Sequence, residues 1–509
     1  AVGPAFGQHQ AVDALPPGPV LAALTAQAVS GPGGLTDDEL TGALQAARRL
    51  ANLADYQQTV MIAEFGRRRR AQFEAARAAG KPAGCRDGEF PGEELAFELV
   101  ETGAYAGARI DTALELTARL PRTLAGMAEG TIDLGRAMTI AAHTAGLTDG
   151  DAAQADEVLA AVAASKRPDQ LARKAAALEM KLAPEVVRAR KELARQLDQR
   201  VETRREGSGN ASLAGRELDT ADVIAAKAHI DAIAARLHDS GLVDGPLGRL
   251  RALVLIDLTQ GRDPLDRIKP AHGQPDVQRG QAADDPGGDR FGPGPVPAVI
   301  NLLVPAGTLL GWGTAPAQAA GWGLLDADET RALVQAAAGH PRTRWCMTIT
   351  APDGTALAHG CAAGRRPWPG ASDGDGPRDG PGPPQAAQLL ELLHRLDITL
   401  EPIARDSCVH RHAEDRYIPS RKLRHLLRAR NQTCAAPACN AQAVCCDIDH
   451  TVPYPDGPTC ECNTNPKCRR HHRIKQAPGW TAAQPAPDTA AWTTPASRTH
   501  TSTATGYDL

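Results

Sequence analysis

Cysteine is concentrated near the end of the chain, and this limits how that part can fold. Seven of the eleven cysteines lie within the 35 residues from 434 to 468. Thiols at this density point to bound metal in a reducing compartment, where disulfides do not persist. Cys434 and Cys439 are separated by four residues, and Cys468 precedes His471 by one helical turn. Together they offer four ligands of the types that zinc takes, the alternative being scattered buried thiols or disulfides.

Further thiols in the cluster leave the exact ligand set open. They are Cys445, Cys446, Cys460 and Cys462. A structural zinc site knits together a region with little core of its own, because binding the metal is coupled to folding. The sequence therefore predicts a small zinc-supported module whose ligands come from these four cysteines and the four residues named above.

The remainder of the chain is poor in the side chains that lead in β-sheets. Hydrophobic residues make up 42 %, but only 6 Phe, 6 Trp and 5 Tyr occur in 509 residues, so Ala, Leu and Val must fill a large core. This composition favours packed helices. Thr36 and Glu39 form a capping box at the start of a helix. Residues 200–204 and 211–215 flank a Gly-rich turn and predict a hairpin.

These patterns predict a mainly α N-terminal region, a small mixed α/β segment and a C-terminal α+β domain. Pro/Gly/Asp-rich stretches cannot bury enough apolar surface to order themselves, and they separate the parts. The expected divisions are a disordered leader (1–35), a helical domain (36–262), a mobile linker (263–297), a mixed α/β segment (298–363), a second linker (364–385) and a C-terminal domain (386–509) that includes a helix at 386–396, a strand near 398–404 and a terminal strand.

Charge is distributed unevenly along the chain. The net charge of the whole sequence is −4, yet residues 416–475 carry eleven Lys and Arg against four Asp and Glu, a local net charge of +7. Such a basic module attracts polyanions, because electrostatic attraction is decided within about 10 Å at 0.1 M salt. No apolar run approaches the ~20 residues that cross a bilayer. We therefore expect a cytoplasmic protein that binds nucleic acid and no membrane.

The cysteine cluster surrounds a motif that resembles a known family. Asp449-His450, then Asn463, then His472 follow the order of the HNH endonucleases, and the match covers residues 416–480. The resemblance is closest to members in which paired zinc ligands bracket the motif. It implies a ββα-metal fold in the C-terminal domain and metal-dependent hydrolysis of DNA phosphodiester bonds.

The resemblance also implies roles for individual residues. His450 matches the general base that takes a proton from the attacking water, and Asn463 matches the residue that fixes the loop facing the base. Asp449 and His472 match the ligands of one catalytic divalent ion, for which Mg²⁺ or Mn²⁺ is expected and Zn²⁺, Ni²⁺ or Co²⁺ is also admitted. Asp447 lies on the same strand face as Asp449 and is a second ligand candidate.

Basic residues near this motif are candidates for phosphate contacts, which orient a duplex without reading its sequence. A solvated helix face is the alternative for the upstream part of this group. The candidates are Arg428, Arg430, Arg469, Arg470, Arg473 and Lys475. A zinc-containing DNA-binding module without catalysis, carried on a helical interaction scaffold, is the alternative function.

The helical region resembles a second family. Its phrase Arg200-Val-Glu-Thr-Arg204 and its helix from Leu247 to Leu258 are similar to the actinobacterial repeat family called domain of unknown function 222, which commonly precedes such a nuclease. This resemblance supplies no activity. A protein partner of the helical region is an additional expectation.

Overall fold

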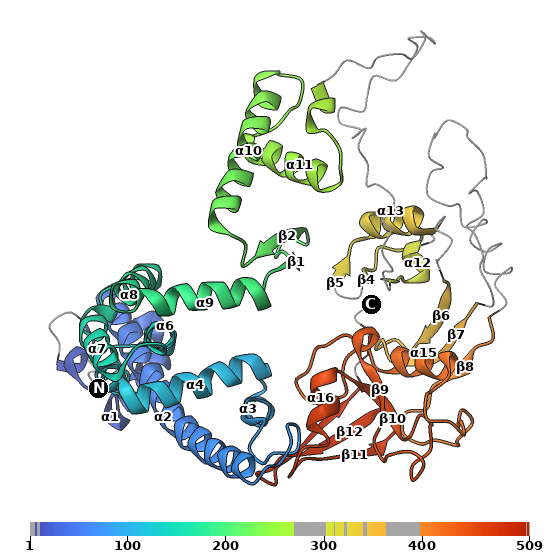
Figure 1. The fold of residues 1–509 in the computed structure, drawn as a ribbon, viewed down its shortest axis with the longest axis horizontal. Helices are drawn as coiled ribbons and strands as arrows, with labels where there is room; N and C mark the ends of the chain where they lie inside the picture. The colour runs from blue at the N-terminus through green and yellow to red at the C-terminus, as the bar shows by residue number, and fades with distance from the viewer. Residues whose placement is uncertain are drawn as a thin grey trace. The chain divides into compact units, whose positions relative to one another are not determined.

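The computed structural model describes residues 6–7, 11–268, 302–309, 311–319, 323–338, 344–362, 398–504 and 506–507. Figure 1 shows the helices and strands, coloured from blue at the N-terminus to red at the C-terminus. The chain divides into two compact units. The first contains Ala1–Arg190, Thr348–His359 and Leu400–Tyr507, and the second contains Lys191–Met347, Gly360–Thr399 and Asp508–Leu509. The helical N-terminal region and the small antiparallel sheets that follow it confirm the fold class at this coarse level.

Nine α-helices open the described chain, and local capping explains where several of them begin. The capping box at Thr36 is present, and Thr102, Asp133 and Thr148 cap later helices. The helices are α1 (Pro19–Val29), α2 (Asp37–Ala78), α3 (Pro91–Leu99), α4 (Gly103–Arg119), α5 (Pro121–Ala128), α6 (Leu134–Thr144), α7 (Asp149–Ala163), α8 (Pro168–Leu182) and α9 (Pro184–Leu197).

The core of this region consists largely of Ala and Leu. Its largest cluster includes Leu116, Leu120, Leu159 and Leu171, each at most 1 % exposed, with seven buried alanines among them. Close packing of small side chains lets helices approach one another, and the sum of many short contacts stabilises the bundle. The scarcity of aromatic residues is therefore compatible with a buried core.

One expectation for this region was wrong. The leader is not disordered throughout, because α1 lies within it and Leu21 belongs to a buried cluster with Phe6 and Ala46. Later in the region, Pro121 begins α5 and separates it from α4. Proline at the first helical position needs no N–H donor, whereas inside a continuous helix it would remove a hydrogen bond.

In the second unit, a predicted hairpin and two long helices precede a small sheet. The hairpin pairs β1 (Arg200–Arg205) with β2 (Ala211–Arg216). The other elements are α10 (Thr220–Asp239), α11 (Leu247–Thr259), a 3-10 helix (Pro264–Ile268), α12 (Ala306–Leu309), α13 (Ala327–Ala338) and an antiparallel sheet of β3 (Leu302–Leu303), β4 (Ala317–Ala319) and β5 (Gly323–Leu325).

The first part of the expected linker 263–297 is ordered, which corrects that prediction. The 3-10 helix forms there because Arg267 donates to the buried carboxylate of Asp257. The remainder of that linker, the linker 364–385 and the helix expected at 386–396 lie outside the described residues. A further three-stranded sheet contains β6 (Cys346–Thr350), β7 (Ala356–Cys361) and β8 (Glu401–Pro402), the last within the strand expected near 398–404.

The last hundred residues of the first unit contain a ββα arrangement. After α15 (Arg421–Arg430), β9 (Asp447–His450) pairs antiparallel with β10 (Thr464–Lys467), and α16 (Arg469–Ile474) follows directly. The single terminal strand expected after it is a three-stranded antiparallel sheet of β11 (Thr481–Ala486), β12 (Thr489–Thr493) and β13 (Thr499–Thr503). Trp492 is fully buried in the core beneath this sheet.

Helix α3 packs into this C-terminal core, although more than 300 residues separate the two in sequence. Phe97 is 4 % exposed and makes edge-to-face contacts with Trp480 and Trp492, with ring centroids 5.6 and 6.0 Å away. On the same helix, Glu94 accepts a hydrogen bond from the backbone N–H of Ala496 at 2.9 Å. Among the described helices, none combines the length and apolarity needed to cross a bilayer.

Candidate functional site

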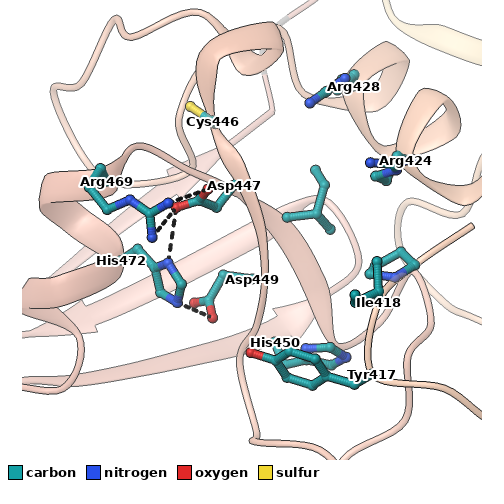
Figure 2. Close-up of a pocket in the computed structure, with 12 residues that line it drawn as sticks. Tyr417, Ile418, Arg424, Arg428, Cys446, Asp447, Asp449, His450, Arg469 and His472 are labelled. Carbon is teal, nitrogen blue, oxygen red and sulfur yellow. Dashed lines mark hydrogen bonds and ion pairs between the residues drawn. The ribbon is translucent and has the colours of Figure 1, made fainter. Parts of the chain in front are cut away.

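A pocket of about 300 Å³ opens where β9, α16 and α15 come together in the first unit (Figure 2). β9 supplies one wall, α16 supplies a second, and α15 with the segment preceding it closes the third. The lining is mainly polar and charged. It consists of Tyr417, Ile418, Pro419, Arg424, Arg428, Cys446, Asp447, Ile448, Asp449, His450, Arg469 and His472.

His472 lies between two carboxylates in this pocket. Its Nε2 atom is 3.1 Å from Oδ1 of Asp449, and its Nδ1 atom is 3.1 Å from Oδ2 of Asp447 (Figure 2). The two aspartates point the same way because they alternate along β9. The structure thus brings together the predicted ion ligands Asp449 and His472, and adds a second carboxylate at the far side of the imidazole.

Two lysines surround the buried carboxylate of Asp449. Oδ2 of Asp449 lies 2.6 Å from Nζ of Lys475 and 3.2 Å from Nζ of Lys467. Burial opposes ionisation of Asp449, but the two ammonium groups hold its pKa below the usual range. Burial also lowers the pKa of Lys467 to about 8. The carboxylate is therefore kept charged inside the protein, as a cation ligand must be.

The hydrogen bonds of His450 define which of its nitrogens is protonated. Nε2 lies 2.7 Å from Oγ1 of Thr459, and that hydroxyl donates its only hydrogen to the backbone oxygen of Arg416 at 2.5 Å. Thr459 must accept from His450, so Nε2 carries the proton and Nδ1 of the neutral ring has a free lone pair. The Tyr417 ring stacks on the imidazole at 5.5 Å. Burial lowers the pKa of His450, against the opposing effect of Asp449.

Asn463 holds the loop between β9 and β10. Its Nδ2 atom donates to the backbone oxygens of Val452 and Pro458, each at 2.9 Å, and its Oδ1 atom accepts from the N–H of Val452 at 2.8 Å. The side chain is 5 % exposed and absent from the pocket lining. Its contacts are those of a loop-fixing residue.

The predicted phosphate contacts divide into those at the pocket and those elsewhere. Arg428 and Arg469 line the pocket. Burial, followed by the charge of Arg424, lowers the pKa of Arg428. Arg473 is exposed outside the lining. Arg470 forms an ion pair with Glu93 instead of facing the pocket.

Arg430 does not face solvent, so its assignment as a phosphate contact is corrected. It is 1 % exposed, and its guanidinium donates to the backbone oxygens of Glu461 and Thr464, both at 2.8 Å. Burial lowers its pKa to about 10. Lys475 is likewise occupied, because it bonds Asp449 and the backbone oxygen of His450. Both side chains therefore bond to protein groups around the pocket and are not available to bind phosphate.

The predicted metal ligands Cys434, Cys439, Cys468 and His471 converge beside this pocket. One potential ligand atom from each lies within 4.8 Å of all the others, so the group can hold a metal ion. Nδ1 of His471 is 3.2 Å from Sγ of Cys468 and 3.6 Å from Sγ of Cys434. The opposite nitrogen, Nε2, lies 3.1 Å from Oε2 of the buried Glu93 on α3. A carboxylate behind a ligating imidazole fixes its orientation and raises its basicity.

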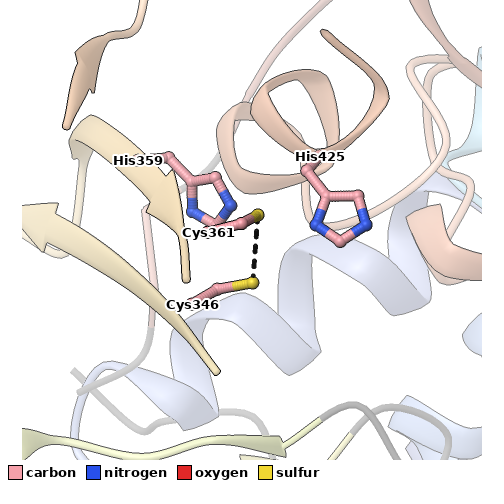
Figure 3. Close-up of side chains that lie close together, drawn as sticks. All are labelled: Cys346, His359, Cys361 and His425. Atoms are coloured by element: carbon pink, nitrogen blue, oxygen red, sulfur yellow. Dashed lines mark hydrogen bonds between the residues drawn. The ribbon is translucent and has the colours of Figure 1, made fainter. Parts of the chain in front are cut away.

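Another group of potential ligands was missed at the sequence level. Cys408, His410, Cys460 and Cys462 also place one ligand atom each within 4.8 Å of all the others. The signal was present, because Cys408 and His410 are separated by one residue, as are Cys460 and Cys462. Figure 3 shows two further cysteines, Cys346 on β6 and Cys361 on β7, whose Sγ atoms lie 3.1 Å apart.

Comparisons with known proteins give a family and three relatives. The model of the family described as Domain of unknown function (DUF222) matches residues 68–370, more than half of the chain. The chain is also 43 % identical, over 90 residues or 18 % of its length, to each of three uncharacterized proteins of Mycobacterium tuberculosis, Rv3776, Rv2100 and MT2160. The match spans only 16–17 % of their own lengths. No solved structure matches.

Proposed function

The chain belongs to the DUF222 family, a domain of unknown function, and since that membership assigns no chemistry we propose, from the pocket, that the protein is a metal-dependent endonuclease of the HNH type acting on DNA. The observation that carries the proposal is the convergence of Asp449, His472 and His450 on one pocket bordered by arginines. A carboxylate, two imidazoles and nearby guanidinium groups are what hydrolysis of a phosphodiester requires.

The donor set of Asp449 and His472 fits a divalent ion. Oδ1 of Asp449 and Nε2 of His472 are 3.1 Å apart, close to the edge of about 3.0 Å that adjacent ligands form around an octahedral ion at about 2.1 Å. Such an ion supplies charge stabilisation to the phosphate and to the leaving oxygen. Asp447 contacts the opposite nitrogen of His472, so we assign it to orienting that ring rather than to binding the ion.

His450 is suited to accept a proton from water. Its hydrogen bond to Thr459 leaves Nδ1 unprotonated, and burial favours the neutral ring. Thr459 and Tyr417 together restrict the ring, one by a hydrogen bond and the other by stacking. Restricting the base in advance reduces the cost of aligning it with the reacting phosphate.

Arginines at the pocket supply the contacts for the anionic backbone. Nε of Arg428 is buried without a hydrogen-bond partner among the described residues, and Arg424 stands one helical turn before it on α15. A buried donor without a partner is costly unless a ligand satisfies it. A phosphate oxygen is such a ligand, and guanidinium groups bind phosphate readily.

The cluster of Cys434, Cys439, Cys468 and His471 is assigned a structural zinc ion. Three thiolates and one imidazole match a closed zinc site, which leaves no open position for catalysis. Its function is then to fasten the start of α16, and hence His472, to the loop after α15. The same module without hydrolysis would be a DNA-binding scaffold, which is the competing function.

Nicking of supercoiled plasmid DNA in Mg²⁺ or Mn²⁺ tests the proposal. We expect His450→Ala to lower the nicking rate by about 10²–10⁴-fold, the contribution typical of a general base. Thr459→Val, which removes the acceptor for Nε2, should lower it by roughly 10–100-fold, as loss of supporting residues typically does. His229→Ala, an exposed histidine on α10, serves as the control.

DNA affinity, measured in parallel by fluorescence anisotropy, separates the competing functions. Binding by His450→Ala at the wild-type affinity would place the defect in chemistry. Wild-type protein that binds DNA but nicks it in neither metal would favour the scaffold. Undiminished nicking by His450→Ala would remove this residue from the mechanism.

A further inference from the structure

Cys408, His410, Cys460 and Cys462 have the same composition as the first cysteine cluster and share no residue with it. Cys408 and His410 lie in the loop between β8 and α15, whereas Cys460 and Cys462 lie just before β10. About fifty residues separate the two pairs, but all four ligand atoms lie within 4.8 Å of one another. The fold has therefore gathered three thiols and an imidazole a second time.

The separations within this group fit tetrahedral coordination. Sγ of Cys408 is 3.5 Å from Sγ of Cys460, and Sγ of Cys462 is 3.6 Å from Nδ1 of His410. Bond lengths of about 2.3 Å for sulfur and 2.0 Å for nitrogen around tetrahedral zinc place two sulfurs about 3.8 Å apart and sulfur and nitrogen about 3.5 Å apart. A disulfide would require about 2.05 Å between the sulfurs.

The backbone around His410 is shaped to this arrangement. His410 has φ of 55°, in the left-handed region, and its N–H donates to Sγ of Cys408 at 3.4 Å. A non-glycine residue adopts this conformation only where the surroundings determine it. Cys460 is fully buried, and a metal ion that binds its sulfur would displace the thiol proton.

We propose that Cys408, His410, Cys460 and Cys462 hold a second structural zinc ion. A closed set of three thiolates and one imidazole selects zinc over the hard ions that carboxylates prefer. The ion would join the loop before α15 to the segment before β10, two stretches about fifty residues apart in the sequence whose cysteines form no disulfide.

The two joined segments are also those that position His450. Thr459 precedes Cys460 directly, and its backbone oxygen accepts from the N–H of Glu414 at 2.9 Å. Arg416, which accepts from the Thr459 hydroxyl, belongs to the same loop as Cys408. Fastening these segments therefore fixes the hydrogen bond that determines the protonation of His450. This consequence rests on the proposed nuclease function, but the metal site does not.

Zinc content of the full-length protein tests the site directly. After dialysis against metal-free buffer, elemental analysis should find two zinc ions per wild-type chain. The double variant Cys408→Ser/Cys462→Ser should retain one, as should Cys434→Ser/Cys468→Ser. Cys445→Ser, which removes an exposed thiol outside both groups, should retain two.

Two further measurements keep the test decisive. Thiol labelling of unfolded, unreduced protein in the presence of chelator, with the labelled cysteines mapped, should find Cys408, Cys460 and Cys462 all as thiols, and a disulfide that includes any of these three would overturn the site. Should the double variant fail to fold, cobalt titration of the metal-free wild type replaces it: the thiolate-to-cobalt absorption band should saturate at two equivalents. Saturation at one equivalent, or the same zinc content in Cys408→Ser/Cys462→Ser as in the wild type, would also overturn the proposal. None of these readouts depends on nicking.

Discussion

Replacing Phe97 with Ala tests whether α3 is part of the C-terminal core. The ring is 4 % exposed and contacts Trp480, Trp492, His471 and His500 at centroid distances of 5.6–6.0 Å. Buried Phe→Ala changes cost about 3–5 kcal/mol, and each aromatic pair adds about 0.5–1.5 kcal/mol beyond area burial. We expect the free energy of unfolding to fall by about 4 kcal/mol.

Urea unfolding followed by tryptophan emission measures this loss. With a slope of about 2.5 kcal/mol per molar urea, the midpoint should fall by about 1.6 M. Two of the six tryptophans, Trp480 and Trp492, contact the Phe97 ring, so the part of the emission change that they contribute reports on this core. Phe97→Leu, which keeps most of the apolar volume, should recover more than half of the loss. An unchanged midpoint in Phe97→Ala would show that α3 does not belong to this core.

Two further predictions concern Glu93, which contacts His471, and the two arginines Arg428 and Arg430 of α15. Glu93→Gln removes the charge behind His471 and should weaken zinc binding at the first cluster by about 10–100-fold in a chelator competition. Glu98→Gln is the control, because Glu98 lies on the same helix but pairs with Arg498 and His500, and it should leave zinc affinity unchanged. Equal zinc affinities in the two variants would refute the role of Glu93. Arg428→Met should weaken DNA binding and reduce its salt dependence by about one phosphate contact, while leaving the urea midpoint near that of the wild type. Arg430→Met should leave DNA binding and its salt dependence unchanged. It should lower the free energy of unfolding by about 2–5 kcal/mol, because buried carbonyl oxygens lose their hydrogen-bond donors. The opposite pattern in the two arginine variants would contradict the burial argument.

The sequence was informative where the chemistry is local. The spacing on a short loop and one helical turn favoured Cys434, Cys439, Cys468 and His471 among eight candidates, and the structure brings one ligand atom of each together. Asp447 was recognised as a neighbour of Asp449 from strand alternation alone. Its contact with the far nitrogen of His472 depends on where α16 packs, and strand alternation does not contain that information.

Tertiary burial explains what sequence patterns could not show. Arg428 and Arg430 are two residues apart in one basic run, yet one lines the pocket and the other is enclosed by the backbone of residues 461–464. Nothing in their local sequence separates them. Likewise, the second ligand group required two loops about fifty residues apart to meet, although the repeated one-residue spacing of its members was visible.

The packing of α3 against the C-terminal region bears on how this protein is divided for study. Residues 400–507 produced by themselves would leave Trp480 and Trp492 without the phenyl ring that covers them, and His471 without its acidic neighbour. We expect such a fragment to self-associate and to bind metal more weakly at the first cysteine cluster, so a lack of cleavage by it would say little about the intact protein. Co-expression with residues 6–190 as a separate polypeptide offers a way to restore the missing helix.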